Sequence, residues 1–120
     1  MDASLMLRTA AWLFVLTALG GLTMAGIRFV GQRNPPVWLS MAHGFAAGAG
    51  ATLLAYAVAT AVVPGTAQAA LLLFVLAAAG GVLMTLRFQW LQRLLPAWLV
   101  LVHALAAVTG FVLLLVAAFR

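Results

Sequence analysis

Two stretches of the sequence decide the fold: GGLTMAGIRFVGQRNPPVWLSMAH at residues 20–43 and GGVLMTLRFQWLQRLLPAWLVLVH at residues 80–103. The second repeats the first at an offset of 60 residues, without a gap. The chain is therefore a tandem duplication, with a first repeat over residues 1–62 and a second over residues 63–120. The matched positions are Gly20 and Gly21 with Gly80 and Gly81, Met24 with Met84, Gln32 and Arg33 with Gln92 and Arg93, Pro36 with Pro96, Trp38 and Leu39 with Trp98 and Leu99, and His43 with His103.

Each repeat contains two long apolar runs, which we expect at about residues 5–30, 37–62, 67–88 and 96–119. About 20 apolar residues suffice for a helix to cross a membrane. Of the residues, 68% are apolar and 6% are charged, and the mean hydropathy is +1.24, so polar groups are too few for a soluble surface. The runs lack the alternation of a membrane β-barrel. The sequence predicts an all-α membrane protein with four transmembrane helices in a lipid bilayer.

The duplication also predicts how these helices are arranged. Each repeat crosses the membrane an even number of times, so both copies have the same orientation. We expect two tandem helical hairpins, related by a pseudo-twofold axis along the membrane normal, that together form one four-helix bundle. The first run resembles a secretory signal peptide, but its counterpart in the second repeat cannot be one. We therefore expect the first span to be retained.

The basic residues predict the orientation of the bundle. All six are arginines, the only acid is Asp2, and no basic stretch exists that would follow a nucleic-acid backbone. We expect no nucleic-acid partner. The positive-inside rule places the arginine-rich connections in the cytoplasm and both termini outward, in the inner membrane of a bacterium. These connections carry Arg28, Arg33, Arg87 and Arg93.

His43 and His103 are the residues in the spans that can carry chemistry. No Asp, Glu or Lys lies within a predicted span, which excludes the acid-driven mechanism of small four-helix multidrug transporters. On a helical wheel, the faces around the two histidines are identical, whereas most other matched positions of these spans differ. Lipid requires only apolarity, so an identical face indicates a specific role. The two faces are Leu39, Ala46, Ala47, Gly50, Leu54 and Ala57, and Leu99, Ala106, Ala107, Gly110, Leu114 and Ala117.

From this pattern we expect one haem b on the pseudo-twofold axis, with His43 and His103 as its two axial ligands. The chain has no cysteine, which excludes covalent c-type attachment. Paired glycines on the first and third spans would admit the porphyrin edge or allow close helix packing. The small residues expected to make room for the macrocycle are Ala47, Gly50, Ala107 and Gly110, and the cations expected near the propionates are Arg28, Arg33, Arg87 and Arg93.

The function expected is that of an electron-transfer protein in the general architecture of membrane b-type cytochromes, or of a haem-holding subunit in a larger redox complex. We expect no enzymatic activity from the chain alone. Its partners would be membrane proteins or further copies of the chain. Two histidines leave room for one haem at most.

Two alternatives stay open. In the first, the chain is a cofactor-free structural or assembly subunit whose imidazoles bond to each other, to a backbone carbonyl or to hydroxyls. In the second, the histidines hold a copper ion or a chlorophyll-type pigment. Met24 and Met84 would then be further candidate ligands, although a repeated Met in an apolar helix usually serves packing. A small channel is disfavoured because the spans supply almost no polar pathway.

Overall fold

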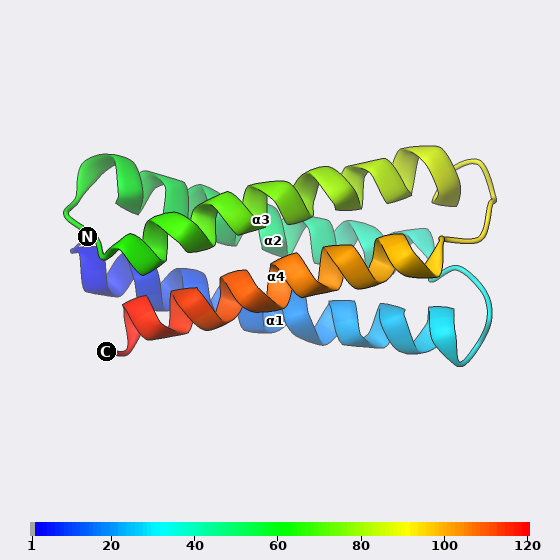
Figure 1. The fold of residues 1–120 in the computed structure, drawn as a ribbon, viewed down its shortest axis with the longest axis horizontal. Coiled ribbons are helices and arrows are strands. Elements are labelled where there is room, and N and C mark those ends of the chain that lie inside the picture. Colours follow the sequence, from blue (N-terminus) through cyan, green and yellow to red (C-terminus); the bar gives the residue numbers. More distant parts are fainter. Residues whose placement is uncertain (1) are drawn as a thin grey trace.

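The computed structural model describes residues 2–120 and consists of four long helices that lie side by side (Figure 1). All four are long and apolar enough to cross a membrane. The longest dimension of the molecule is 43 Å, close to the ~40–45 Å thickness of a bilayer with its headgroups. The predicted all-α fold with four candidate membrane spans is confirmed, and the chain is a multi-pass membrane protein by these criteria. The helices are α1 (Ala3–Phe29), α2 (Val37–Thr60), α3 (Gly65–Met84) and α4 (Ala97–Ala118), with a short π-helix, η1 (Thr85–Gln89), continuing α3.

The helix starts follow from local chemistry. The Asp2 side chain caps α1 by accepting a hydrogen bond of 2.7 Å from the backbone N–H of Leu5. The other three long helices begin directly after a proline, at Pro36, Pro64 and Pro96. Proline has a fixed φ and no N–H to leave unpaired, so it suits the position just before a helix.

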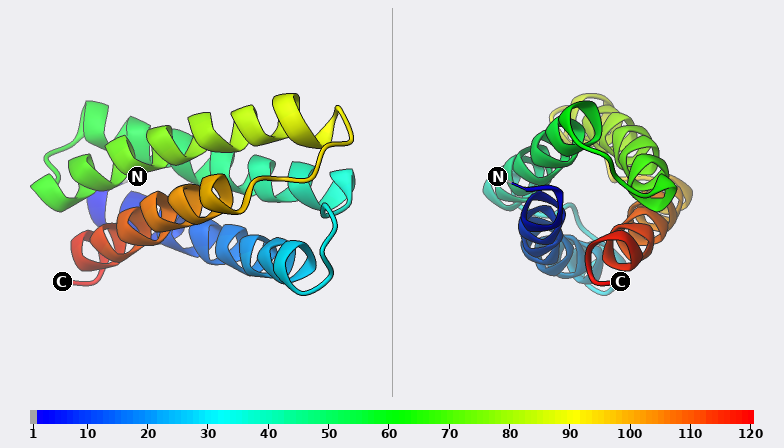
Figure 2. Two further views of the ribbon diagram at one scale, coloured as in Figure 1. Left: turned by 45° about the vertical axis from the view of Figure 1, so that its right-hand side comes forward. Right: turned by 90° about the vertical axis from the view of Figure 1, so that its left-hand side faces the viewer.

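The helices form a closed ring in the order α1, α2, α3, α4 when the bundle is viewed along its axis (Figure 2). The most extensive packing is between α1 and α2 and between α3 and α4, and smaller contacts join α2 to α3 and α1 to α4. Each repeat is therefore a tightly packed hairpin. The arrangement places α2 and α4, which carry the two histidines, at opposite corners of the bundle.

The buried core lies toward one end of the bundle, which we call the terminal end because it holds both termini and the α2–α3 connection (Figure 1). There the rings of Phe14 and Phe74 stack at a centroid distance of 3.8 Å, nearly parallel at 6°. These matched phenylalanines, one from each hairpin, join the two hairpins across the bundle axis. The core cluster comprises Met6, Leu7, Ala10, Ala11, Phe14, Leu54, Ala57, Ala67, Ala70, Phe74, Leu114 and Ala118.

At the opposite end, which we call the arginine end, polar side chains join the two hairpins. Arg28 Nε donates to the carbonyl oxygen of Leu95 at 2.7 Å, and Gln89 Nε2 donates to that of Pro35 at 2.9 Å. Pro35 and Leu95 occupy matched positions in the two repeats, each just before the proline that precedes a helix. Each hairpin thus supplies a donor to the other hairpin, and the two acceptor carbonyls occupy matched positions. Asn34 adds two bonds between the connections, through Arg93 O and Leu95 N.

The π-helix makes the arginine end unequal in the two hairpins. Arg28 follows Gly21 by seven residues, whereas Arg87 follows Gly81 by six. The left-handed residues that follow, Gln32 and Gln92, occupy matched positions and have φ values of 54° and 55°, so both connections turn in the same way. Arg28 is buried, while Arg87, whose matched residue is Ile27, is exposed.

Candidate functional site

The two histidines lie opposite each other inside the bundle. Both side chains are half-buried, His43 from α2 and His103 from α4. The ring centroids are 6.2 Å apart, and the ring planes meet at 63°. The rings therefore share one site in the interior, at the depth where the two hairpins face each other.

Each imidazole is held by a backbone carbonyl of its own hairpin. His43 Nδ1 lies 2.8 Å from Thr17 O, and His103 Nδ1 lies 2.7 Å from Ala77 O. A carbonyl oxygen can only accept, so in both rings Nδ1 is the nitrogen that carries the hydrogen. In the neutral ring, Nε2 then holds the lone pair. This is the hydrogen-bonding pattern of histidines that ligate metals through Nε2.

The repeated glycine pairs make these hydrogen bonds possible. A Cβ placed on Gly21 would lie 3.1 Å from His43 Cε1, and one placed on Gly81 would lie 3.3 Å from His103 Cε1. In a helix, the carbonyl of residue i is flanked by the side chains of residues i+3 and i+4, which here are Gly20 and Gly21 after Thr17. Because these positions lack a Cβ, the imidazole can approach the carbonyl. Their role is thus to seat the histidines, rather than only to bring helices together.

Both Nε2 atoms remain available for a ligand. Neither has a hydrogen-bond partner among residues 2–120, and neither is sealed off by protein atoms. Two neutral rings with lone pairs on Nε2 cannot hydrogen-bond to each other through these atoms, because both are acceptors. The sequence-based alternative of a direct imidazole pair is not what the structure shows, while the alternative of a backbone carbonyl partner is.

Few side chains are buried around the histidines. Thr17 and Ala77, whose carbonyls bond the two rings, are buried. Within the described part of the chain, every residue in 18–27, 40–49, 78–83 and 100–109 is at least partly exposed. The next buried cluster toward the arginine end is that of Met84, Leu95 and Leu99.

The small residues expected around a macrocycle have different surroundings. The space beside Gly50 is filled by Phe14, since an added Cβ would lie 2.8 Å from Phe14 Cε2. An added Cβ on Gly110 would lie 3.3 Å from Phe74 Cε1. Both glycines therefore make room for the aromatic stack, and the cofactor contacts that we propose do not include them. Ala47 packs against the core and Ala107 is half-buried on α4.

The four candidate arginines are not equivalent. Arg28 is only 8% exposed and is directed to the second hairpin through its bond to Leu95 O. Arg33, Arg87 and Arg93 are exposed. Three of the four thus lie at the molecular surface, and one lies inside the bundle.

The methionines have ordinary packing roles. Met24 Sδ accepts a hydrogen bond of 3.5 Å from Ser40 Oγ, and Met84 lies in the small cluster with Leu95 and Leu99. Residues 2–120 contain no group of three or more His, Cys, Asp or Glu side chains that would enclose a metal ion. The protein therefore offers two strong metal ligands at this site, and no more.

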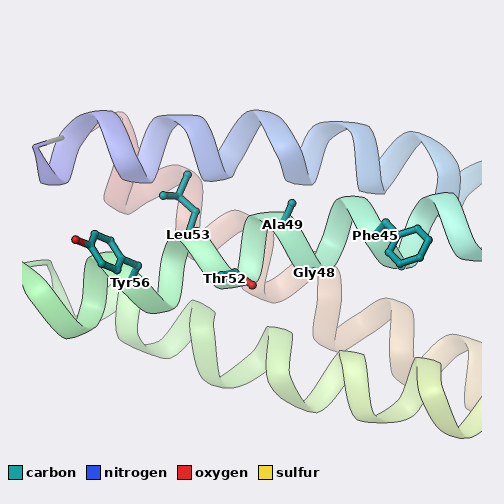
Figure 3. Close-up of a pocket in the computed structure, with 7 residues that line it drawn as sticks. Phe45, Gly48, Ala49, Thr52, Leu53 and Tyr56 are labelled. Carbon is teal, nitrogen blue, oxygen red and sulfur yellow. The ribbon is translucent and has the colours of Figure 1, made fainter.

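An open groove lies away from the histidines, along α2. Figure 3 shows Phe45 and Tyr56 at its two ends, with Gly48, Ala49, Thr52 and Leu53 between them. In α4, Val108 stands at the position matched to Gly48. The groove is not lined by either histidine and is not part of the histidine site. It is lined by Gly44, Phe45, Gly48, Ala49, Thr52, Leu53 and Tyr56.

Comparison with models of known protein families, with curated proteins and with solved structures finds no match for this chain.

Sequence reasoning missed the carbonyls that orient the histidines. A backbone carbonyl needs no particular side chain, so the matched residues Thr17 and Ala77 differ and draw no attention. The usable signal was the repeated glycine pair, three and four residues after each carbonyl. Its fixed spacing marks where a side chain from another helix meets the backbone.

Proposed function

We propose that the chain is a membrane b-type cytochrome-like protein that holds one haem b between His43 and His103. It would act as a one-electron carrier, or as the haem-holding subunit of a larger membrane redox complex. The observation that carries the proposal is the pair of imidazoles with Nδ1 bonded to backbone carbonyls and Nε2 left free, at a ring separation of 6.2 Å.

The ring separation fits a single metal atom between the histidines. Metal–nitrogen bonds of about 2.0–2.1 Å to one nitrogen of each ring would allow ring centres roughly 6.3 Å apart, and two rings in direct edge contact lie within the same range. The value in the structure is 6.2 Å. A bare ion would still need further ligands, and no other His, Cys, Asp or Glu joins this pair in residues 2–120. A porphyrin supplies four equatorial nitrogens of its own, so two axial histidines complete its iron.

The surroundings also fit a planar group. The residues that flank the histidines on α2 and α4, 40–49 and 100–109, are at least partly exposed, whereas the clusters toward each end of the bundle are buried. The hairpins contact each other less than the helices within each hairpin do. A planar group held by both histidines would lie between α2 and α4, the helices at opposite corners of the bundle, with Ala47 and Ala107 as candidate neighbours. The pseudo-twofold relation of the hairpins belongs to this proposal, because it would make the two histidines equivalent.

When bound, haem supplies reversible one-electron chemistry. The chain's own residues would orient the ligands and exclude water. The carbonyls of Thr17 and Ala77 fix the tautomer and direction of each ring. The stacked rings of Phe14 and Phe74 close the site toward the terminal end. With little protein outside the membrane, electrons would pass to and from partners in or on the bilayer, which we place in a bacterial inner membrane with the arginine end in the cytoplasm.

The competing proposal is a cofactor-free structural subunit. It is favoured by the same histidine–carbonyl bonds, because each also joins the two helices of one hairpin. It leaves both Nε2 lone pairs without a role. The two proposals differ in whether the purified protein carries a pigment.

A reduced-minus-oxidised absorption spectrum of the protein, expressed in haem-proficient cells, tests the proposal. We expect a sharp Soret band, α and β bands of low-spin haem on reduction, and one haem for each chain by extraction. A folded but colourless preparation that gives no such spectrum after haem is supplied would favour the structural subunit. Extraction of copper or of a chlorophyll-type pigment would replace haem with that group.

A further inference from the structure

Arg28 is the one charged side chain that the bundle buries. It is 8% exposed, and its guanidinium lies 5.4 Å from the centre of the Phe29 ring. Of its five N–H groups, only the one on Nε has a protein acceptor among residues 2–120, the carbonyl of Leu95. The only acid in the chain, Asp2, caps α1 at the opposite end of the bundle. The chain thus provides no counter-ion for a buried cation.

The two terminal nitrogens of the Arg28 guanidinium have no protein acceptor among residues 2–120, and they are not sealed off by protein atoms. Their N–H groups are therefore free to bind an anion. The bond between the hairpins does not require a charge, as the other hairpin shows. There the neutral amide of Gln89 donates to the matched carbonyl of Pro35 and to Ser40 Oγ. The bond to Leu95 alone therefore does not account for a charged residue at this position.

The position of Arg28 relates it to the histidine site. It follows Gly21, which contacts His43, by seven residues, or about 10 Å along the helix. Its Nε is held at the carbonyl of Leu95, two residues before the start of α4, so the guanidinium lies on the arginine-end side of the histidines. Arg28 is thus the buried cation on the arginine-end side of the site, at a depth that the carboxylates of a macrocycle can reach.

We infer that Arg28 is the binding partner of a carboxylate on the cofactor, and that the site selects a macrocycle with free carboxylates over an esterified one. This inference rests on the proposed function. It separates Arg28 from Arg33, Arg87 and Arg93, which are exposed. Because the matched donor in the other hairpin is neutral, one carboxylate would be paired with a charge and the other would not.

The test compares two probes, iron protoporphyrin IX and its dimethyl ester, in absorption titrations of the full chain in lipid nanodiscs. A hydrogen bond to a charged group corresponds to a factor of roughly 10–100 in affinity. We expect the wild-type protein to bind the free acid tighter than the ester by about this factor. Arg28→Gln should lose the preference, since the amide keeps the bond to Leu95 but removes the charge. Arg87→Gln, which removes an exposed arginine with the same change in net charge, should keep it.

Three results would overturn the inference. The first is equal binding of both probes by the wild-type protein. The others are an Arg28→Gln variant that keeps the preference for the free acid, and an Arg87→Gln variant that loses as much of this preference as Arg28→Gln does. If the ester still gives a low-spin spectrum in these cases, the proposed histidine ligation stands and only the role of Arg28 fails. If neither probe gives a low-spin spectrum with wild-type protein, the proposed function fails and the inference with it. If Arg28→Gln unfolds, two other measurements test the role of Arg28. One is the preference of the wild-type protein for the free acid over the ester. The other is Arg28→Lys, which keeps the charge and should keep part of that preference.

Discussion

At the scale of single residues, the chemistry depends on a three-part unit that occurs twice. A histidine on one helix donates through Nδ1 to a carbonyl on the next helix, and a glycine pair leaves that carbonyl accessible. In the first hairpin the unit is His43, Thr17 and the pair Gly20 and Gly21. The hydrogen bond fixes which nitrogen is free, so the unit presents a lone pair in a set direction. The ring is oriented by the backbone, whether or not a ligand is bound.

Adding a methyl group at Gly21 tests this unit. In Gly21→Ala the new Cβ would lie 3.1 Å from His43 Cε1, so the ring must move away from its carbonyl. We expect a loss of about 1–3 kcal/mol in the free energy of unfolding, as for other overpacked sites. The matched control is Gly26→Ala in the same helix, where nothing lies within 4 Å.

The control should be neutral or stabilise the protein by about 0.5–1 kcal/mol, because alanine is the better helix former. Thermal or denaturant unfolding of both variants in the same detergent measures the difference. Equal stability of Gly21→Ala and Gly26→Ala would show that the glycine does not seat the ring.

At the scale of the helices, each histidine-bearing helix uses one face for two purposes. Near the arginine end the face presents a histidine, and toward the terminal end it presents a glycine against an aromatic ring. Gly50 of α2 meets Phe14 and Gly110 of α4 meets Phe74, so the identity of the two faces has two physical causes. The sequence pattern distinguished one face of each helix, but it could not separate the part around the histidine from the part that packs in the core.

Gly50→Ala tests the assignment to the core. Its Cβ would lie within 2.8 Å of Phe14 Cε2, closer than real Cβ atoms come. We expect a loss of about 1–3 kcal/mol of stability. Combining it with Phe14→Leu should cost less than the sum of the single changes, because the shorter side chain frees the space. Gly48→Ala on the same helix, with nothing within 4 Å, serves as the control.

Strict additivity in this double-mutant cycle would contradict the contact between Gly50 and Phe14. So would a Gly50→Ala variant as stable as Gly48→Ala. In either case, Gly50 would again be a candidate for lining a cofactor site.

The helices themselves could be predicted from the sequence, because long apolar runs between prolines leave no other regular structure for a membrane span. The π-helix could not. Residues 85–89 match residues 25–29 without a gap, and the residue pattern does not distinguish a π-helix from an α-helix there. Arg28 and Arg87 stand at unmatched positions, and the burial of one and the exposure of the other became visible only in three dimensions.

At the scale of the whole molecule, the bundle has a packed end, a polar end and a level between them that carries the histidines. The packed end holds the stacked phenylalanines, and the polar end holds the hydrogen bonds between the connections. Each end joins the hairpins without using the middle. Under the proposed function, the level of the histidines would hold the ligand while the two ends of the bundle hold the hairpins in place.

The orientation in the membrane is testable by labelling, because the chain contains no cysteine. Val62 is 99% exposed at the terminal end, and Leu94 is 48% exposed at the arginine end. In intact cells, a membrane-impermeant maleimide should label Val62→Cys and leave Leu94→Cys unlabelled until the cells are opened. This follows from the positive-inside rule. The reverse pattern would place the arginine end outside, and equal labelling of both would contradict a single orientation.

The most direct measurement is the absorption spectrum of His43→Ala and of His103→Ala, each purified in parallel with the wild-type protein and supplied with haem. Because the two rings would share one iron, we predict that each single change abolishes the low-spin spectrum, leaving five-coordinate high-spin haem or none. The variants should remain folded, since the stacked phenylalanines and the polar end still join the hairpins. A wild-type low-spin spectrum that survives in either variant would contradict shared ligation by the two histidines.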